Sequence, residues 1–468
     1  MDGDRIVGIT PFARPELVEG RAAVLDFGDL VVSPGLVDTH VHINEPGRTA
    51  WEGFDTATRA AAAGGVTTLV DMPLNSIPAT TTVAALEAKR AAARGQCHVD
   101  VGFWGGVVPG NDGDLDGLVD AGVRGFKCFL VPSGVDEFPY VREEDLRRAM
   151  PVLARRDVPL LVHAELPDLI RSPEASRSTN GEPSTIDDEW RARPFDSLTL
   201  SLSKGELAQD RLQPGVYASY LASRPPEAEV EAIRLVARLA RGFGVRTHIV
   251  HVAAAEAVAQ IERAKAEGVP ITAETCPHYL TFAAPEIADG ATEFKCAPPI
   301  RDASHREALW EGLRRGVLDL IATDHSPAPP GMKCPGDFMR AWGGIASLEV
   351  SLAAVWSGVT QAFRPASAGR EPGASYRELI ARWMSERPAA LAGLGHRKGR
   401  IAQGLDADLV VWDPDAEFVV DPGHLQQRHK VTPYANRRLR GRVVTTFVRG
   451  ARVWDDRSIV SASMGSLL

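Results

Sequence analysis

Two histidines, His40 and His42, are separated by one residue in the stretch 36–43. This stretch has the pattern of a β-strand, and because successive side chains of a strand point to opposite faces, Asp38, His40 and His42 share one face. A Pro-Gly pair at 46–47 ends the strand, so both imidazoles are expected at its carboxyl end. Neutral imidazole is a common metal ligand, and this spacing indicates a metal-ligand pair. For an isolated His-X-His motif, a strand with two ordinary polar residues is an equally open interpretation.

The elements that position this pair follow from hydrophobic periodicity. Strand-like apolar runs alternate with helical patterns from residue 36 onward, which is typical of repeated βα units around a parallel sheet. Eight such strands, mostly separated by helical patterns, favour a closed (β/α)₈ barrel of the TIM type over an open sheet. The predicted strands are 36–43, 66–72, 98–104, 123–130, 159–164, 246–252, 271–275 and 318–323.

The two ends of the chain differ from this pattern. Beyond a predicted helix at 376–387, the stretches 399–412 and 443–454 are strand-rich with polar turns, while the N-terminal strand-like pieces 5–9, 22–25 and 30–32 are too few to form a domain alone. The fold class is therefore α/β, with residues 34–396 as the barrel. Residues 1–33 and 397–468 are expected to form a small composite domain of β-sandwich type. The polar, aperiodic segment 172–214 is expected to be a mobile loop.

Composition restricts the class of partner. The chain has 468 residues, is 44% hydrophobic and carries a formal net charge of −9, so it can bury a large core but offers no basic field for nucleic acid or anionic lipid. It has no apolar run near the length of about 20 residues that spans a membrane and no signal-type start, which predicts a soluble cytoplasmic protein. The five cysteines are scattered without CxxC spacing, as expected of reduced thiols.

Polar side chains stand where the predicted strands end, which is the face of such a barrel that carries catalytic groups. A single histidine, lysine or aspartate there is more often structural, and only its recurrence at several strands favours a site. His248 lies three positions before His251, so only one of the two can face the site, and His251 is nearer the strand end. The candidate metal ligands are His40, His42, Lys127, His163, His251 and Asp324.

Lys127 is the unusual member of this set, because an ammonium group between metal cations would be repelled. Reaction of its neutral amine with carbon dioxide gives a carbamate, an anion with two oxygens that can bridge two metals. With that carbamate, the four histidines and Asp324 could hold two divalent cations about 3.5–4 Å apart, which activate a bridging water. Such a site keeps a net positive charge and attracts the oxygen of a carbonyl group.

The ordered ligand set and the stretches around it resemble the amidohydrolase superfamily, in the cyclic amidohydrolase branch that contains hydantoinases, dihydropyrimidinases, dihydroorotases and allantoinases. Within this branch the resemblance is closest to the allantoinases and extends over about residues 32–453. The stretches that carry it are HINEPGRTAWEGF (42–54), DMPLNS (71–76), FKCFL (126–130), ETCPHYL (274–280), FKCAPPIR (294–301), DHSP (324–327) and AWGG (341–344).

The resemblance implies a TIM-type barrel, two divalent metal ions per subunit and Lys127 in the form of N6-carboxylysine. The metal is expected to be zinc, with cobalt, manganese and iron as alternatives that suit the same ligands. The resemblance further implies a homotetramer that hydrolyses the ring of a small molecule, allantoin, to allantoate. In the family mechanism, activated water attacks the ring carbonyl, and the catalytic residue Asp324 takes its proton and passes it to the leaving nitrogen.

Substrate contacts are predicted on two grounds. Asn44 and Asn75 carry carboxamides, which both donate and accept hydrogen bonds and so match a ureido group. Backbone groups at Ala297, Trp342 and Gly343 align with substrate-contacting positions of the branch.

Departures from the other members narrow the choice of substrate. Dihydroorotases carry an arginine where Asn44 stands, and hydantoinases and dihydropyrimidinases carry a tyrosine shortly after the lysine, a region that here is LVPSG (130–134). A hydantoinase-like or dihydropyrimidinase-like cyclic amidase remains the alternative, and a non-catalytic assembly protein on the same fold is a second one. The segments 11–20 and 194–210 match nothing in the allantoinases and are expected to be insertions.

Overall fold

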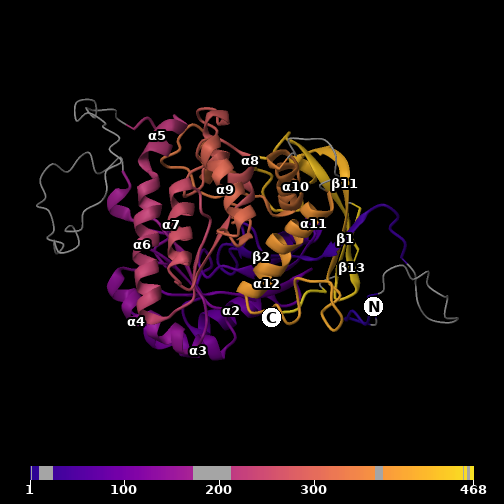
Figure 1. Ribbon diagram of the computed structural model, residues 1–468, viewed down its shortest axis with the longest axis horizontal. Coiled ribbons are helices and arrows are strands. Elements are labelled where there is room, and N and C mark those ends of the chain that lie inside the picture. The colour runs from indigo at the N-terminus through magenta and orange to yellow at the C-terminus, as the bar shows by residue number, and fades with distance from the viewer. Residues whose placement is uncertain (2, 10–24, 172–211, 364–372, 457, 461–463) are drawn as a thin grey trace, which may run out of the picture.

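The computed structural model describes residues 1, 3–9, 25–171, 212–363, 373–456, 458–460 and 464–468. Figure 1 shows two parts, a group of helices around parallel strands and a layer of antiparallel strands beside it. The insertions predicted at 11–20 and 194–210, and most of the loop predicted at 172–214, lie outside the described residues.

Parallel strands form the core of the larger part. They pair in two sheets, in the orders β2-β3-β4 and β5-β6-β7-β8-β9-β10. These strands are β2 (Leu36–Val41), β3 (Val66–Asp71), β4 (Asp100–Phe103), β5 (Gly105–Gly106), β6 (Phe126–Phe129), β7 (Leu160–His163), β8 (Thr247–Ile249), β9 (Ile271–Thr275) and β10 (Leu320–Ile321).

Backbone hydrogen bonds close these two sheets into one ring. Trp104 alone separates β4 from β5, and its N–H donates to Asp71 O at 3.0 Å while the next N–H, of Gly105, donates to Gly125 O at 2.9 Å. The other seam is closed where His42 N–H donates to His325 O at 2.8 Å. If β4 and β5 are counted as one interrupted strand, the ring has the eight parallel strands of a (β/α)₈ barrel, as the sequence predicts.

Helices cover the outside of the barrel. In α4 (Glu143–Arg155) the buried residues include Leu146, Ala149, Met150 and Leu153, the spacing of one apolar helix face. The other helices are α1 (Phe54–Ala63), α2 (Val83–Ala93), α3 (Leu115–Asp120), α5 (Tyr217–Ser223), α6 (Pro226–Phe243), α7 (Ala255–Ala266), α8 (Pro277–Thr281), α9 (Ala303–Arg315), α10 (Ser351–Ala362), α11 (Gly373–Ala381) and α12 (Arg387–Leu391). The helix predicted at 376–387 is present, with a π-helical turn, Arg382–Glu386, between α11 and α12. Single 3₁₀ turns are η1 (Asp112–Asp114), η2 (Pro167–Leu169), η5 (Ala284–Glu286), η6 (Thr292–Phe294), η7 (Pro330–Lys333), η8 (Leu348–Val350) and η10 (Pro422–His424).

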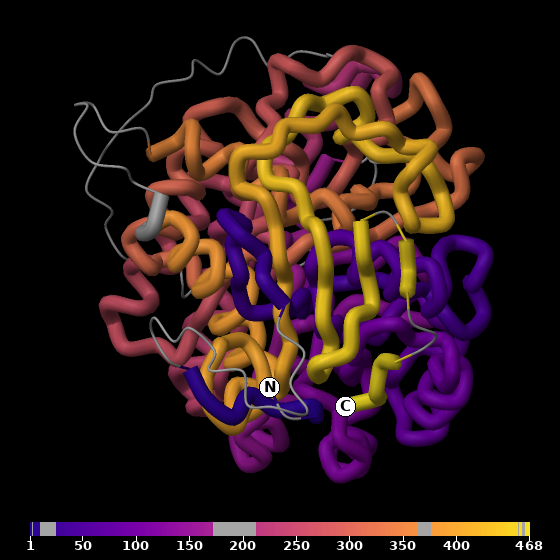
Figure 2. The backbone as a smooth tube through the Cα atoms, turned by 90° about the vertical axis from the view of Figure 1, so that its right-hand side faces the viewer, coloured from indigo at the N-terminus to yellow at the C-terminus, as the bar shows by residue number. Residues whose placement is uncertain are grey.

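The smaller part is an antiparallel sheet formed by both ends of the chain. Its strand order is β1 (Val31–Pro34), β11 (Leu409–Val419), β12 (Arg438–Val448), β13 (Ala451–Asp455) and β14 (Ser458–Ile459). Figure 2 shows the N-terminal strand beside the C-terminal ones, and Val31 pairs with Trp412. The sheet therefore has the composite origin that the sequence predicts.

Of the strand-rich stretch predicted at 399–412, only 409–412 lie in a strand, and the strand-like piece predicted at 5–9 is wrong. Residues 399–408 form turns, and the positive φ angles of Gly399 (88°) and Gly404 (83°) explain why an extended strand cannot run through them. Residues 5–9 make only an isolated bridge, in which Ile6 N–H donates to Leu405 O at 3.0 Å. Of the predicted strand 22–25, residues 22–24 lie outside the described residues.

A buried ammonium group joins the turn at 398–408 to the barrel. Lys398 Nζ lies 2.6 Å from Asp100 Oδ2, 2.6 Å from Asp408 Oδ2 and 3.1 Å from Asp406 Oδ2. Burial disfavours the ammonium form, but Asp408 and Asp100 outweigh it and raise the pKa of Lys398. The three carboxylates are close enough together to hold a metal ion. Because Lys398 already supplies their positive charge, we interpret the cluster as structural.

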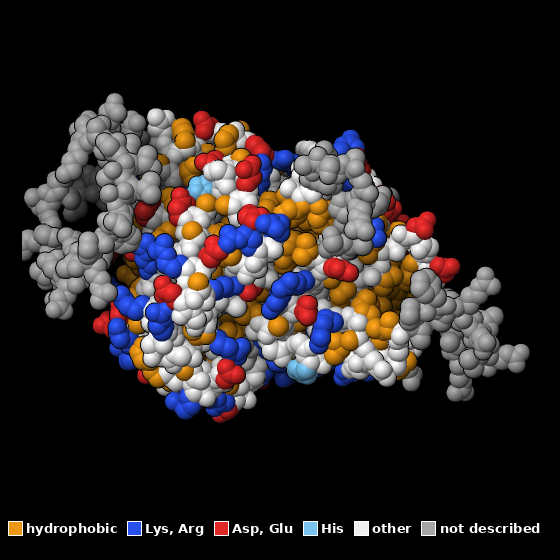
Figure 3. All heavy atoms as spheres, in the orientation of Figure 1, with side chains coloured by type: hydrophobic (Ala, Val, Ile, Leu, Met, Phe, Trp, Pro, Cys, Tyr) orange, Lys and Arg blue, Asp and Glu red, His pale blue; other side chains and the backbone are white. Residues whose placement is uncertain are grey.

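No helix within the described ranges is long and apolar enough to cross a bilayer. The face in Figure 3 carries interspersed basic and acidic side chains, with no expanse of one sign.

Replacing Lys398 by Met should destabilise the protein, because the buried Asp408 loses its ion-pair partner in the described chain, while Asp100 and Asp406 keep arginines. Breaking a buried ion pair typically costs about 3–5 kcal/mol. Urea unfolding followed by circular dichroism measures the effect. Arg400→Met is the control, since Arg400 is exposed and its one side-chain hydrogen bond, to Gly395 O, is long at 3.4 Å. Equal midpoints for the two variants would contradict the structural role of Lys398.

Candidate active site

The six predicted ligands converge at the carboxyl ends of the barrel strands. His40 lies in β2 and His42 just beyond it, Lys127 lies in β6, and His163 ends β7. His251 and Asp324 follow β8 and β10. All six are buried, and five of them line one cavity, with Lys127 beneath its surface. Side chains from five strands thus meet at one rim, which is the arrangement that a metal centre requires.

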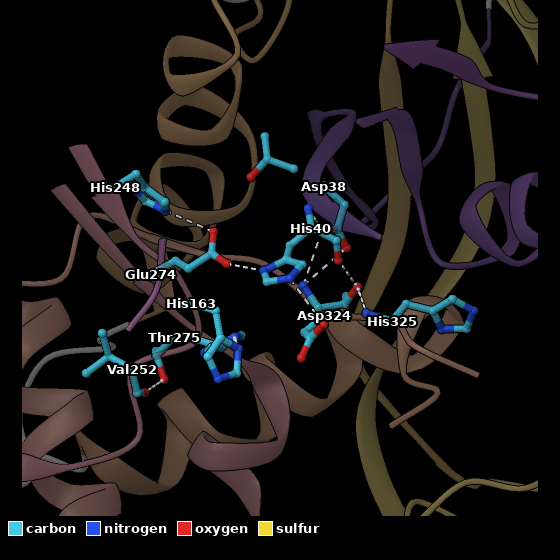
Figure 4. Close-up of polar contacts among 12 residues, drawn as sticks. Asp38, His40, His163, His248, Val252, Glu274, Thr275, Asp324 and His325 are labelled. Atoms are coloured by element: carbon cyan, nitrogen blue, oxygen red, sulfur yellow. Dashed lines mark hydrogen bonds and ion pairs between the residues drawn. The ribbon is translucent and has the colours of Figure 1, made fainter. Parts of the chain in front are cut away.

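Asp324 is the centre of one group of ligands. Its Oδ1 lies 3.2 Å from His40 Nε2 (Figure 4). The same oxygen lies 3.4 Å from His42 Nε2. The three ligand atoms lie within 4.8 Å of one another, close enough to hold one metal ion. Burial by itself would raise the pKa of Asp324, but His40, His42 and His251 hold it below its usual range. Asp324 is therefore a carboxylate, the form that binds a cation.

His163 and His251 form a second group. His251 Nε2 lies 2.9 Å from His163 Nδ1, and the two ring centroids are 4.5 Å apart. Burial lowers the pKa of both imidazoles, so both are neutral, which is the metal-binding form. His251 Nδ1 is buried and has no hydrogen-bond partner among the described residues.

Lys127 lacks a hydrogen-bond partner as well. Its Nζ is fully buried and unpaired within the described chain, 5.0 Å from the centroid of the Phe129 ring. Burial lowers the pKa of this amine to about 8, although Glu274 and Asp324 oppose the shift. Buried polar groups are rarely left unpaired. The unpaired atoms of Lys127 and His251, beside a carboxylate and three further imidazoles, fit a site that holds metal ions.

Carboxylates behind the imidazoles orient them. Glu274 lies between two histidines, with Oε1 2.5 Å from His40 Nδ1 and Oε2 3.0 Å from His248 Nε2 (Figure 4). Glu165 lies 2.7 Å from His163 Nε2 and 2.6 Å from Arg224 Nη1. By engaging one ring nitrogen, such carboxylates fix the orientation of the imidazole and make the other nitrogen a better ligand.

The sequence alone did not predict the supporting roles of Glu274, Glu165 and Arg224. One signal was available, because Glu274 falls inside the buried strand predicted at 271–275, where a carboxylate must be paired. Its partners, however, come from positions 26 and 234 residues away in the chain.

Backbone conformation is unusual at four positions of the site. Asn44, Asn75, His251 and Asp324 have φ angles of 67°, 66°, 42° and 47°. Residues other than glycine rarely adopt this left-handed region, and such strain is concentrated at functional sites. His251 and Asp324 each follow a barrel strand, and at both positions the left-handed backbone turns the side chain toward the cavity.

The cavity has a volume of about 1060 Å³. Asn75, Ala297, Trp342 and Gly343, all predicted substrate contacts, line its wall. Asn44 does not line it, because its side-chain Nδ2 is directed to Pro327 O at 3.4 Å.

Three further histidines lie near the site. His248 Nδ1 lies 2.8 Å from Thr272 Oγ1 and its Nε2 faces Glu274, so it points away from the cavity. His325 Nδ1 accepts hydrogen bonds from the backbone of Ser347 and Leu348. His278 is fully buried, and burial lowers its pKa to about 4. None of the three lines the cavity in the described structure.

Comparison with known proteins gives a consistent family. The model of the amidohydrolase family matches residues 31–453. The allantoinase of Streptomyces avermitilis is 47% identical, over 94% of this chain and 88% of the relative, and that of Arabidopsis thaliana is 42% identical, over 96% and 82%. Among solved structures, the L-hydantoinase (dihydropyrimidinase) of Arthrobacter aurescens superposes with a TM-score of 0.79 at 29% identity, covering 94% of this chain and 88% of that one.

Glu274→Gln should weaken the binding of a divalent metal ion by about 10–100-fold, because it removes the negative charge that orients His40 and His248. Competition with a chromogenic chelator measures this affinity. Glu286→Gln is the matched control, since Glu286 is exposed and pairs only with surface arginines. If both variants bind metal as the parent does, Glu274 has no part in the site.

Proposed function

The chain belongs to the amidohydrolase family, and from this premise we propose that it hydrolyses the cyclic amide bond of allantoin to give allantoate. It is a hydrolase that acts on carbon–nitrogen bonds in cyclic amides. The observation that carries this proposal is the convergence of four imidazoles, a lysine and a carboxylate at the base of one cavity, in a chain 42–47% identical to proteins named allantoinase.

The site would hold two divalent metal ions. His40, His42 and Asp324 would bind one ion. His163 and His251 would bind the other, and Lys127 lies close to both pairs of histidines. Zinc fits these ligands, and so do cobalt, manganese and iron. Two ions there would supply a nucleophile at neutral pH, because metal binding lowers the pKa of water from 15.7 to about 7.

Lys127 would take part as N6-carboxylysine. The neutral amine forms an N–C bond to carbon dioxide and releases one proton. Burial supports this, because a lysine whose pKa is lowered to about 8 has more neutral amine at physiological pH than an exposed one. Because the carbamate is an anion, it would also replace the repulsion between a buried ammonium group and the metal cations by attraction.

Asp324 would carry the proton of the reaction. As a carboxylate it accepts a proton on its side-chain oxygen from the attacking water, and it then donates that proton to the ring nitrogen as the C–N bond breaks. General acid–base catalysis of this kind typically contributes about 10²–10⁴-fold in rate. The contacts of Asp324 Oδ1 with His40 and His42 keep this oxygen at the base of the cavity.

The walls would orient the ring. Asn75 lines the cavity, and its Oδ1 is buried with no partner in the described chain, so it can accept a hydrogen bond from a ureido N–H. Ala297 and Gly343 would present backbone groups from the other side. Pro132, Ser133 and Gly134 form the part of the wall where hydantoinases are expected to place a tyrosine, which favours allantoin over hydantoins.

The proposal also includes a homotetramer in the cytoplasm. The tetramer rests on the family resemblance. A reducing compartment is supported by the cysteines, since all five are free and four are buried.

A substrate panel tests the proposed function. The purified, metal-replete enzyme should show its highest kcat/KM with allantoin among allantoin, hydantoin, dihydrouracil and dihydroorotate. Asp324→Asn serves as the chemical control and should lower kcat by about 10²–10⁴-fold. A preference for hydantoin or dihydrouracil would replace allantoin with the hydantoinase-like alternative, and absence of turnover with all four would reject the proposal.

A further inference from the structure

Two lysines hold one loop of the cavity wall by its carbonyl oxygens. Lys295 Nζ donates to Ala341 O at 2.6 Å and to Met339 O at 3.2 Å. Lys333 Nζ donates to Trp342 O at 3.3 Å and to Gly344 O. The loop 339–344 thus gives four of its six carbonyl oxygens to two ammonium groups.

Neither lysine has an acidic partner. No carboxylate oxygen in the described chain forms an ion pair with Lys295 or Lys333, although Lys333 is only 5% exposed. Burial lowers the pKa of each to about 8. Burying a charge without a counter-ion is costly unless strong hydrogen bonds offset it. The carbonyl bonds, and for Lys295 the Tyr220 ring 5.2 Å away, are the interactions that retain these cations.

In the same loop, the backbone N–H and C=O of one residue, Gly343, are free within the described chain. Trp342 N–H donates to Met332 O at 2.7 Å, and Gly344 N–H donates to Lys295 O at 2.8 Å. Within the described structure, the N–H and C=O of Gly343 between them make no hydrogen bond, and Gly343 lines the cavity. A free donor beside a free acceptor matches the N–H and C=O of a ureido group.

We propose that Lys295 and Lys333 are positioning residues that fix the loop 339–344, so that the peptide groups of Gly343 face the cavity and set the affinity for a cyclic ureide. The inference rests on the proposed function. The lysines do not touch the reacting atoms. They act on binding, because their bonds determine which peptide groups of the loop remain available to the substrate.

The test compares Lys295→Met and Lys333→Met with Lys265→Met. Lys265 is the matched control, since it also bonds a backbone carbonyl, Gly316 O at 3.3 Å, and belongs to α7, outside the residues that line the cavity. Three quantities are measured: kcat and KM for allantoin, bound metal per subunit, and amide hydrogen exchange of the peptide covering 339–346.

Lys295→Met and Lys333→Met should each raise KM about tenfold, which corresponds to the loss of one charge-assisted hydrogen bond. The value of kcat should change by less than about threefold, because an interaction made equally in ground and transition states affects KM alone. Exchange should become faster in 339–346 only, the metal content should stay at the parental value, and Lys265→Met should change none of these.

Unchanged KM and unchanged exchange in Lys295→Met would overturn the inference, and so would a fall in kcat without a rise in KM. If Lys333→Met does not fold, Lys295→Met decides alone, since Lys295 is only partly buried. If the parent enzyme hydrolyses no cyclic amide, the proposed function fails. Faster exchange confined to 339–346 in the two variants would still support the positioning role of Lys295 and Lys333, and unchanged exchange would reject it.

Discussion

The site depends on one electrostatic constraint, the burial of the Asp324 carboxylate among imidazoles. Its Oδ1 lies 3.2 Å from His40 and 3.4 Å from His42, and no lysine or arginine pairs with it in the described chain. A buried charge is stable only if it is paired or coordinates a metal. The neighbouring Lys127 amine and His251 nitrogen, both without partners, require the same explanation. Metal ions, with Lys127 carboxylated, would satisfy all three groups at once, which is why we interpret the rim of the barrel as a metal centre.

Closure of the barrel brings the parts of this centre together. The last strand meets the first where the carboxylate of Asp38 accepts a hydrogen bond from Thr323 N–H at 3.2 Å and His42 N–H donates to His325 O at 2.8 Å. His40 and His42 are therefore held beside Asp324, although about 280 residues separate them in the chain. The strained backbone at Asp324 is maintained by these bonds on both of its sides.

The sequence predicted those features that depend on local pattern. Strand alternation was sufficient to place His40 and His42 on one face, and the recurrence of apolar runs was sufficient for the barrel. It could not predict the orientation of Asn44, which is set by a left-handed backbone conformation and by Pro327 on the other side of the same seam. Nor could it reveal the partners of Glu274 or of Lys295 and Lys333, the two lysines that bind loop 339–344, because these partners are distant in the chain.

Anomalous diffraction from crystals of protein purified without chelators tests the central claim most directly. Data collected on both sides of the zinc, cobalt, manganese and iron absorption edges should give two anomalous peaks about 3.5–4 Å apart. One should lie between His40, His42 and Asp324 and the other beside His163 and His251, with electron density for a carboxyl group continuous with Lys127 Nζ. An unmodified Lys127 and no anomalous peak among these six side chains would contradict the account.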